Sequence, residues 1–184
     1  SSASTSNFVV CDVTGSGGSL SSFSGSGTTY TATFTPTADG APTIDVAAGA
    51  FTDASGYSNA AATQFNWTYD STAPTITGNS LASDNSTIAV TFSEAVYNTS
   101  GGSGSLEVAD FVFSISGGSA TLASTTPSSI SVSSNTYTLG ISLSGTANGS
   151  ETLTVNPVDD SIYDIAGNEA STSQRNNTCL LYTS

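Results

Sequence analysis

Apolar and polar residues alternate one by one in several short stretches, and this period of two most constrains the fold. In residues 30–34, Tyr, Ala and Phe alternate with threonine, and in residues 88–92 Ile, Val and Phe alternate with Ala and Thr. Successive side chains of a strand point to opposite faces, so each stretch predicts a strand with one core face and one solvated face. No window shows sustained helical periodicity. Short strands separated by Gly, Asn and Pro turns predict an all-β fold of antiparallel sandwiches.

The stretch Asp70-Ser71-Thr72-Ala73-Pro74-Thr75 separates two such runs of predicted strands. Its proline has no N–H to donate to a strand ladder, and it biases the preceding alanine toward an extended conformation. We therefore predict a joint here, with one domain over residues 1–70 and a second domain over residues 71–178.

The two halves of the chain repeat each other in part. Residues 8–10 match residues 111–113, each followed by a Gly-rich turn, and residues 53–56 match residues 164–167. The strands predicted before residue 111 have no counterpart before residue 8. We therefore predict two tandem sandwiches of which the first lacks its N-terminal strands, so that core residues are exposed and a strand edge is unpaired.

Two local interpretations concern the first domain. Residues 8–13 are apolar enough to predict a strand. Phe65, Trp67 and Tyr69 alternate along the predicted closing strand. This spacing predicts that the three rings face the core, in preference to forming a platform for a sugar.

Charge and residue usage exclude several function classes. The 184 residues include 14 acidic residues, one Arg, no Lys and no His, and the net charge is −13. Such a chain is repelled by nucleic acid phosphates and favours cations as small partners. Without His there is no Ser-His or Cys-His dyad, and we predict that the chain is not an enzyme. No run of about 18 apolar residues is present, so we predict no membrane span in this fragment.

The last six residues form a separate question. Cys179-Leu180-Leu181-Tyr182-Thr183-Ser184 is similar to the peptide translated from a common transposon-type sequencing adapter, which predicts a non-native tail over residues 179–184. The alternative is an ordinary closing strand, because these residues are apolar enough. A disulfide between Cys11 and Cys179 is conceivable, but under the adapter interpretation Cys11 is a lone thiol.

Several motifs together resemble tandem bacterial immunoglobulin-like (Ig-like) domains of large surface adhesins. They are Thr-Ala-Thr-Phe-Thr-Pro-Thr-Ala-Asp-Gly at residues 31–40, Ile-Asp-Val-Ala-Ala-Gly-Ala-Phe-Thr-Asp at residues 44–53, the joint, Val-Thr-Phe-Ser-Glu-Ala-Val at residues 90–96 and Asp-Ile-Ala-Gly-Asn at residues 164–168. The resemblance covers roughly residues 8–178. It departs at Gly56-Tyr57, where the family pattern has Gly-Asn, and this puts a ligand role of that loop in doubt.

The resemblance implies a secreted, repetitive protein of the cell surface that serves adhesion or biofilm formation and is often stiffened by calcium. It also implies neighbouring Ig-like repeats as partners, with a surface or glycan target that the sequence does not name. We predict structural or adhesive spacer modules of an extracellular bacterial surface protein. The alternative is an accessory, non-catalytic Ig-like module of a secreted polysaccharide-degrading enzyme.

Acidic residues that are far apart in sequence are predicted to meet beside the joint. In an immunoglobulin-type Greek key, the loops after the second and penultimate strands lie at the pole where the chain enters. That order brings Glu94 together with Asp159, Asp160 and Asp164, and Asp70 lies in the joint. Ca²⁺ takes 6–8 oxygen ligands, including carboxylates. We therefore predict a Ca²⁺ site formed by Asp70, Glu94, Asp160 and Asp164.

The alternative interpretation needs no metal. Asp53 and Asp164 would then only accept the hydrogen bonds of Asx turns, and Gly56 and Gly167 would supply the positive φ angles that such turns require. Glu94 would be a solvated side chain.

Overall fold

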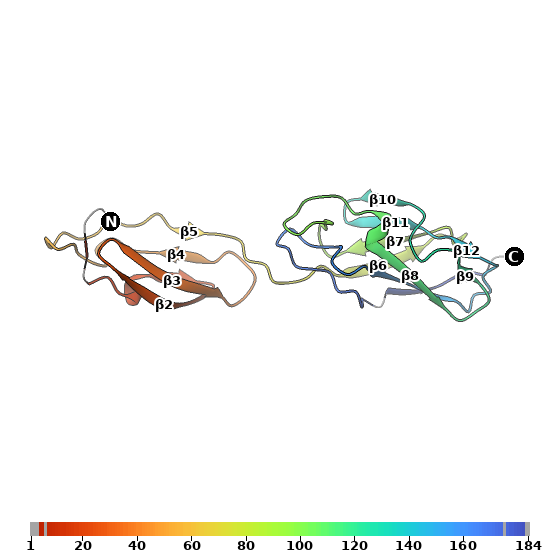
Figure 1. The fold of residues 1–184 in the computed structure, drawn as a ribbon, viewed down its shortest axis with the longest axis horizontal. Coiled ribbons are helices and arrows are strands. Elements are labelled where there is room, and N and C mark those ends of the chain that lie inside the picture. The colour runs from red at the N-terminus through yellow and green to blue at the C-terminus, as the bar shows by residue number, and fades with distance from the viewer. Residues whose placement is uncertain (1–3, 6, 175, 183–184) are drawn as a thin grey trace. The chain divides into compact units, whose positions relative to one another are not determined.

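The computed structural model describes residues 4–5, 7–174 and 176–182. These residues form antiparallel strands, loops and two 3-10 turns. They divide into two compact units, Ser1–Ser71 and Thr72–Ser184 (Figure 1). The division falls inside the stretch that we interpret as the joint. Within the described ranges, no helix is long and apolar enough to cross a membrane.

The first unit contains a three-stranded sheet and a two-stranded sheet. The three-stranded sheet has the order β1-β4-β5, and the hairpin β2-β3 forms the other. A register shift between Ser21 and Ser24 interrupts the hairpin. The strands are β1 (Thr14–Ser16), β2 (Gly18–Ser26), β3 (Thr29–Pro36), β4 (Thr43–Asp45) and β5 (Phe65–Asn66).

The second unit contains a four-stranded sheet of order β10-β11-β7-β6, a three-stranded sheet of order β14-β13-β8 and the short pair β12-β9. Its strands are β6 (Ile76–Leu81), β7 (Thr87–Phe92), β8 (Phe111–Ser116), β9 (Thr121–Leu122), β10 (Ile130–Ser133), β11 (Thr136–Gly140), β12 (Leu143–Ser144), β13 (Thr152–Pro157) and β14 (Asn176–Cys179).

The two units share one plan. The sheet β1-β4-β5 corresponds to β8-β13-β14 in strand order and pairing, and the hairpin β2-β3 corresponds to β10-β11. The second unit adds β6 and β7 beside β11. The predicted fold class is therefore confirmed: the chain forms two antiparallel Ig-like sandwiches, of which the first lacks its two N-terminal strands.

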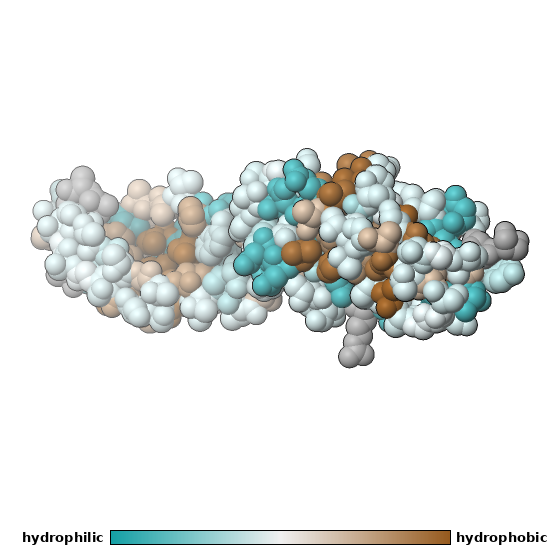
Figure 2. Space-filling view, turned by 45° about the vertical axis from the view of Figure 1, so that its right-hand side comes forward, coloured by the Kyte–Doolittle hydropathy of each residue, from teal (hydrophilic) through white to brown (hydrophobic). Residues whose placement is uncertain are grey.

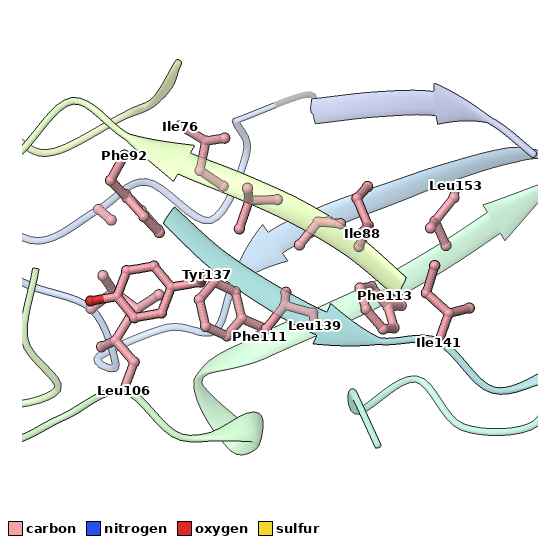
Figure 3. Close-up of a cluster of buried hydrophobic side chains, with 14 of the residues drawn as sticks. Ile76, Ile88, Phe92, Leu106, Phe111, Phe113, Tyr137, Leu139, Ile141 and Leu153 are labelled. Atoms are coloured by element: carbon pink, nitrogen blue, oxygen red, sulfur yellow. The ribbon is translucent and has the colours of Figure 1, made fainter. Parts of the chain in front are cut away.

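The core of the second unit lies between its two main sheets. Alternate residues of β7, β11 and β13 point into it, and Ile88, Leu139 and Leu153 are completely buried (Figure 3). The rings of Phe92 and Tyr137 meet edge to face with centroids 5.8 Å apart. Burial of each such side chain stabilises the folded state by about 1.5–3 kcal/mol, so the period of two in the sequence specifies this core directly.

The first unit has no comparable core. None of the Ala, Val, Ile, Leu, Phe, Tyr or Trp side chains described in it is as buried as those in the core of the second unit. Apolar side chains instead reach its surface (Figure 2). These side chains are exposed because the strands that would correspond to β6 and β7 are missing, and a sandwich needs two complete sheets to exclude water from its interior.

Residues 8–13 contain a short 3-10 turn and do not form the strand that the sequence predicts. The turn η1 (Val10–Asp12) is fixed by the N–H of Val9, which donates to Asp12 Oδ2 at 2.8 Å. The turn η2 (Val108–Asp110) repeats this arrangement, with the N–H of Glu107 donating to the Asp110 carboxylate at 2.7 Å. The two units therefore align on their two aspartates, and the predicted match of residues 8–10 with 111–113 is out of register.

The closing strand of the first unit is shorter than its aromatic pattern predicts. β5 ends at Asn66, and Phe65 is 63% exposed, so its prediction as a core residue is wrong. Trp67 is half-buried and packs edge to face on Phe34 of the other sheet, with centroids 5.2 Å apart. Two residues of pairing with β4 are too few to hold the whole aromatic run on one face.

The C-terminal residues pack into the second unit. Cys179 ends β14, and Leu180 is 2% exposed. The amide of Asn85 donates to Leu181 O at 2.7 Å and accepts the Leu181 N–H at 2.9 Å. Residues 183–184 of the predicted tail lie outside the described residues. The origin of residues 179–184 as adapter sequence stays a prediction that the coding DNA tests. Cys11 and Cys179 are both free and exposed.

Candidate metal site

The loop of residues 164–168 holds a buried aspartate. Asp164 is completely buried, and its two oxygens accept hydrogen bonds from the backbone N–H and the side-chain amide of Asn168, both at 2.8 Å. The loop closes through the Asp164 N–H and the Asn168 carbonyl, and Gly167 adopts a φ of 93°. The Asx turn predicted from the sequence is therefore present, and it fixes the direction of the carboxylate.

A second carboxylate lies beside Asp164. An oxygen of Glu94, in the bend after β7, lies within 4.8 Å of an oxygen of Asp164. The chain enters this unit at the same place, because the Ser93 N–H donates to Thr75 O at 2.8 Å and the Thr75 N–H donates to Ser93 Oγ at 3.0 Å. The structure thus brings together two acids 70 positions apart (from 94 to 164) at the pole where the chain enters, as the strand order predicts.

Asp70 belongs to the first unit and precedes its last residue, Ser71. It is half-buried, and it follows Tyr69, which forms a two-way backbone bridge with Gly40 at 2.9 Å. Ser71 donates from its N–H and its hydroxyl to Asp39 Oδ1, at 2.8 Å and 2.7 Å. These contacts hold the chain on either side of Asp70 within the first unit.

Asp160 is not in the group of mutually close acidic side chains to which Glu94 and Asp164 belong. Asp160 is exposed and has a positive φ of 55°. Its N–H donates to Glu169 Oε1 at 2.7 Å, and the Tyr163 hydroxyl donates to its carboxylate at 3.4 Å. Burial, followed by the negative charges of Asp160 and Glu169, raises the pKa of Tyr163 above its usual value. Asp159 is also exposed.

The corresponding loop of the first unit has the same backbone but a different side chain at its end. The N–H groups of Ser55 and Tyr57 donate to Asp53 Oδ1 at 2.8 Å and 3.0 Å, and Gly56 has a φ of 84°. Tyr57 stands where Asn168 stands in the second unit, and it is 74% exposed. The departure from the Gly-Asn pattern therefore removes a side-chain amide from beside the aspartate and leaves the turn intact.

Sequence reasoning missed a second buried carboxylate, that of Glu151. It is completely buried and accepts hydrogen bonds from the backbone N–H groups of Ser119, Ala120, Asn148 and Gly149 at 2.8–3.2 Å. These N–H groups, Ala120 foremost, lower its pKa from 4.5 to about 2 against the opposing effect of burial.

The surroundings of Glu151 show a structural role. Four backbone donors occupy its oxygens, and it joins the loop after β8 to the loop before β13. A side chain at Gly118 would collide with the Glu151 carboxylate, and Gly118 has a φ of 60°. The one signal in the sequence is a glutamate between a Gly-containing turn and a strand, which is too common to single out.

The pair Glu94 and Asp164 has the chemistry of a hard-cation site. Carboxylate oxygens are the ligands that Ca²⁺ prefers, and waters or backbone carbonyls complete its shell in most proteins. Close carboxylates repel each other, and a cation between them would remove that cost. Among the described residues, the cluster contains no His or Cys ligand, which disfavours zinc.

Comparisons with known proteins support the fold class. No curated protein and no solved structure matches the chain. Residues 2–69 match the family model of the bacterial Ig-like domain. This match is to the first unit, and together with the shared plan of the two units it supports the Ig-like, all-β fold class of the chain.

Proposed function

We propose that this chain supplies non-catalytic spacer modules of an extracellular bacterial surface protein, and that Ca²⁺ stiffens the joint between them. The observation that carries the proposal is the buried Asp164 with Glu94 beside it, at the pole where the chain enters the second unit. Structural modules of this kind need stable folds and controlled joints, and they need no catalytic group.

The rigidity of the Asp164 loop supports metal binding. The carboxylate is fixed by Asn168 before any ion arrives, so little conformational entropy is lost on binding. Glu94 is half-exposed and lies in a bend, and it can adjust to the ion. Sites in extracellular modules bind Ca²⁺ with Kd values on the order of 10⁻⁴–10⁻³ M.

We propose Asp70 as a further ligand because it lies close in sequence to Thr75, which is held beside Glu94. Four residues separate Asp70 from Thr75, which is hydrogen-bonded to Ser93 next to Glu94. An extended chain spans roughly 3.3 Å per residue, so this linker is long enough for the Asp70 carboxylate to join the pair. A ligand on each side of the joint would convert a hinge into a stiff connection.

The binding prediction is tested by calorimetry on the full chain. We expect saturable Ca²⁺ binding, with a gain of about 2.7 kcal/mol in the unfolding free energy of the second unit at calcium 100-fold above Kd. Glu94→Gln and Asp164→Asn should each weaken binding by about tenfold or more, because each removes a negative ligand. Asp53→Asn is the matched control, since it changes the corresponding turn of the first unit.

The same titration decides the ligand set. Asp160→Asn should match the wild type if Asp160 is not a ligand, and it should resemble Glu94→Gln if it is. A wild-type chain that shows neither heat of binding nor thermal stabilisation at millimolar Ca²⁺ would remove calcium from the proposal.

The spacer role is tested separately. Small-angle X-ray scattering of the full chain should give a narrower distribution of interatomic distances with calcium than with chelator, and Asp70→Asn should abolish the difference. If calorimetry shows no Ca²⁺ binding to the wild type, the metal site is wrong. If Ca²⁺ binds but the distribution of interatomic distances does not become narrower, the stiffening is wrong. The coding region beside this segment should contain further Ig-like repeats, and a neighbouring catalytic domain would favour the accessory role in a polysaccharide-degrading enzyme.

A further inference from the structure

The hairpin β2-β3 of the first unit has an open edge. In the second unit, β11 pairs with β10 on one side and with β7 on the other. In the described part of the first unit, the corresponding strand β3 pairs with β2 alone. Both hairpins turn through two residues, and both second strands begin Thr-Tyr-Thr, so Tyr30 of β3 corresponds to Tyr137 of β11.

A cavity of about 650 Å³ lies in the first unit at the turn end of this hairpin, where Gly27, Thr28 and Tyr30 line it. Its apolar lining includes Phe8, Tyr30, Val46 and Phe51. The centroid of the Phe8 ring lies 5.1 Å from that of Tyr30 and 4.7 Å from that of Phe51, yet all three side chains remain partly exposed. In the second unit, Phe92 at the end of β7 packs on the corresponding tyrosine.

The described N-terminal residues contact one end of this region. The Thr5 N–H donates to Gly27 O at 3.0 Å in the hairpin turn, and the Tyr30 hydroxyl donates to Thr5 O at 2.8 Å. From Thr29 onward, no described strand lies along the open edge of β3. Unpaired strand edges next to exposed apolar side chains are sites at which another strand adds.

We propose that the open edge of β3 and its adjoining cavity form a docking site for a β-hairpin of the β6-β7 kind, supplied from outside residues 1–184. The incoming strand runs antiparallel to β3. It places one aliphatic residue opposite Tyr30 and another opposite Ala32, as Val90 lies opposite Tyr137 and Ile88 opposite Leu139 in the second unit. Its intervening residues are small and polar and face solvent.

The charge balance favours such a hairpin over a second copy of this chain. Each copy carries a net charge of −13, so two copies repel each other. The hairpin of residues 76–92 has Asp84 as its one charged residue, and that residue lies in its turn. A hairpin of this chemistry brings backbone donors and acceptors, aliphatic side chains and almost no added charge.

The test adds a synthetic peptide of residues 75–93 to the full chain. We expect saturable protection of the alternate β3 amides that face the open edge, with hydrogen exchange slowed by about tenfold or more. The fluorescence of Trp67, the sole tryptophan, reports on the unfolding of the first unit. With the peptide bound, the melting temperature of this unit should rise by roughly 10 °C. The control peptide carries Ile88→Asp and Val90→Asp, which keep the length and introduce charge on the face that docks.

Equal protection by both peptides, or none by the first, would overturn the proposal. So would protection of β3 that rises with protein concentration in the absence of peptide, because it would identify a second copy as the occupant. If the peptide is insoluble, residues 75–105 can replace residues 1–7, because Leu106 precedes Asp110 by the same four positions as Phe8 precedes Asp12. This chimera must have a higher melting temperature of the first unit, followed by Trp67 fluorescence, than the original chain, and its Val90→Asp version must not.

Discussion

Replacing Glu151 with glutamine should lower the melting temperature of the second unit by roughly 10 °C or more at neutral pH. The carboxylate accepts hydrogen bonds from four backbone N–H groups in a completely buried site. Glutamine has the same shape, but it offers one acceptor oxygen and places an NH₂ group against backbone donors. Those donors lose their partner while they remain buried, which is among the most costly defects that a point substitution creates.

The effect of Glu151→Gln should depend on pH in a defined window. The pKa of Glu151 is lowered from 4.5 to about 2, so the folded state favours the charged form. Its stabilising contribution is fully present above about pH 4.5 and is lost as the pH falls toward 2. The difference in stability between the wild type and the variant should therefore shrink across that window.

Thermal denaturation of the full chain, followed by far-ultraviolet circular dichroism at a series of pH values from 2 to 7, measures both effects. Glu107→Gln is the matched control, because Glu107 is exposed in the same unit. A variant that melts with the wild type at pH 7, or a difference that is constant across the acid range, would show that the Glu151 carboxylate does not hold these loops together.

Replacing Leu180 with alanine should destabilise the second unit by about 3 kcal/mol. Leu180 is 2% exposed and belongs to the main core, although it follows the last strand. Truncation of the side chain leaves a cavity among packed core side chains. The chain around it cannot easily move to fill this cavity, because the Leu180 N–H donates to Glu151 O at 3.0 Å. Leu181→Ala is the control, because this neighbouring side chain is 44% exposed and its truncation should cost less than about 0.5 kcal/mol.

Urea unfolding of the two variants measures the difference. Equal midpoints for Leu180→Ala and Leu181→Ala would mean that the C-terminal residues are not part of the core in solution. Comparison with the natural coding sequence then shows which residue the full-length protein has at position 180.

The fold was predictable because its core strands follow one simple rule. The alternation in residues 88–92 reappears as Ile88, Val90 and Phe92 buried at 2% exposure or less, and residues 153 and 155 behave in the same way. The loop of residues 164–168 was also predictable, since an aspartate followed three positions later by glycine specifies an Asx turn through local hydrogen bonds. Such features depend on neighbours in sequence.

Features that depend on tertiary contacts were not predictable. Residues 8–13 have the composition of a strand, but the Asp12 carboxylate captures a local N–H and forms a turn instead. Glu151 carries no pattern of its own, because its donors come from a loop some 30 positions away as well as from its own. Asp160 shares a loop with Asp164, yet its backbone bonds to Glu169 and directs it elsewhere.

We expect the paired hydrogen bonds between Asn85 and Leu181 to determine how the second unit responds to tension. Asn85 is 2% exposed, has a φ of 58° and lies in the turn between β6 and β7, on the opposite sheet from β14. A pull on the C-terminal end therefore loads this amide and the anchored Leu180 before it can peel β14 from β13 one residue at a time. The Asn85 side chain thus connects the end of the chain to the opposite sheet. Unfolding under force should begin when its two hydrogen bonds to Leu181 break together.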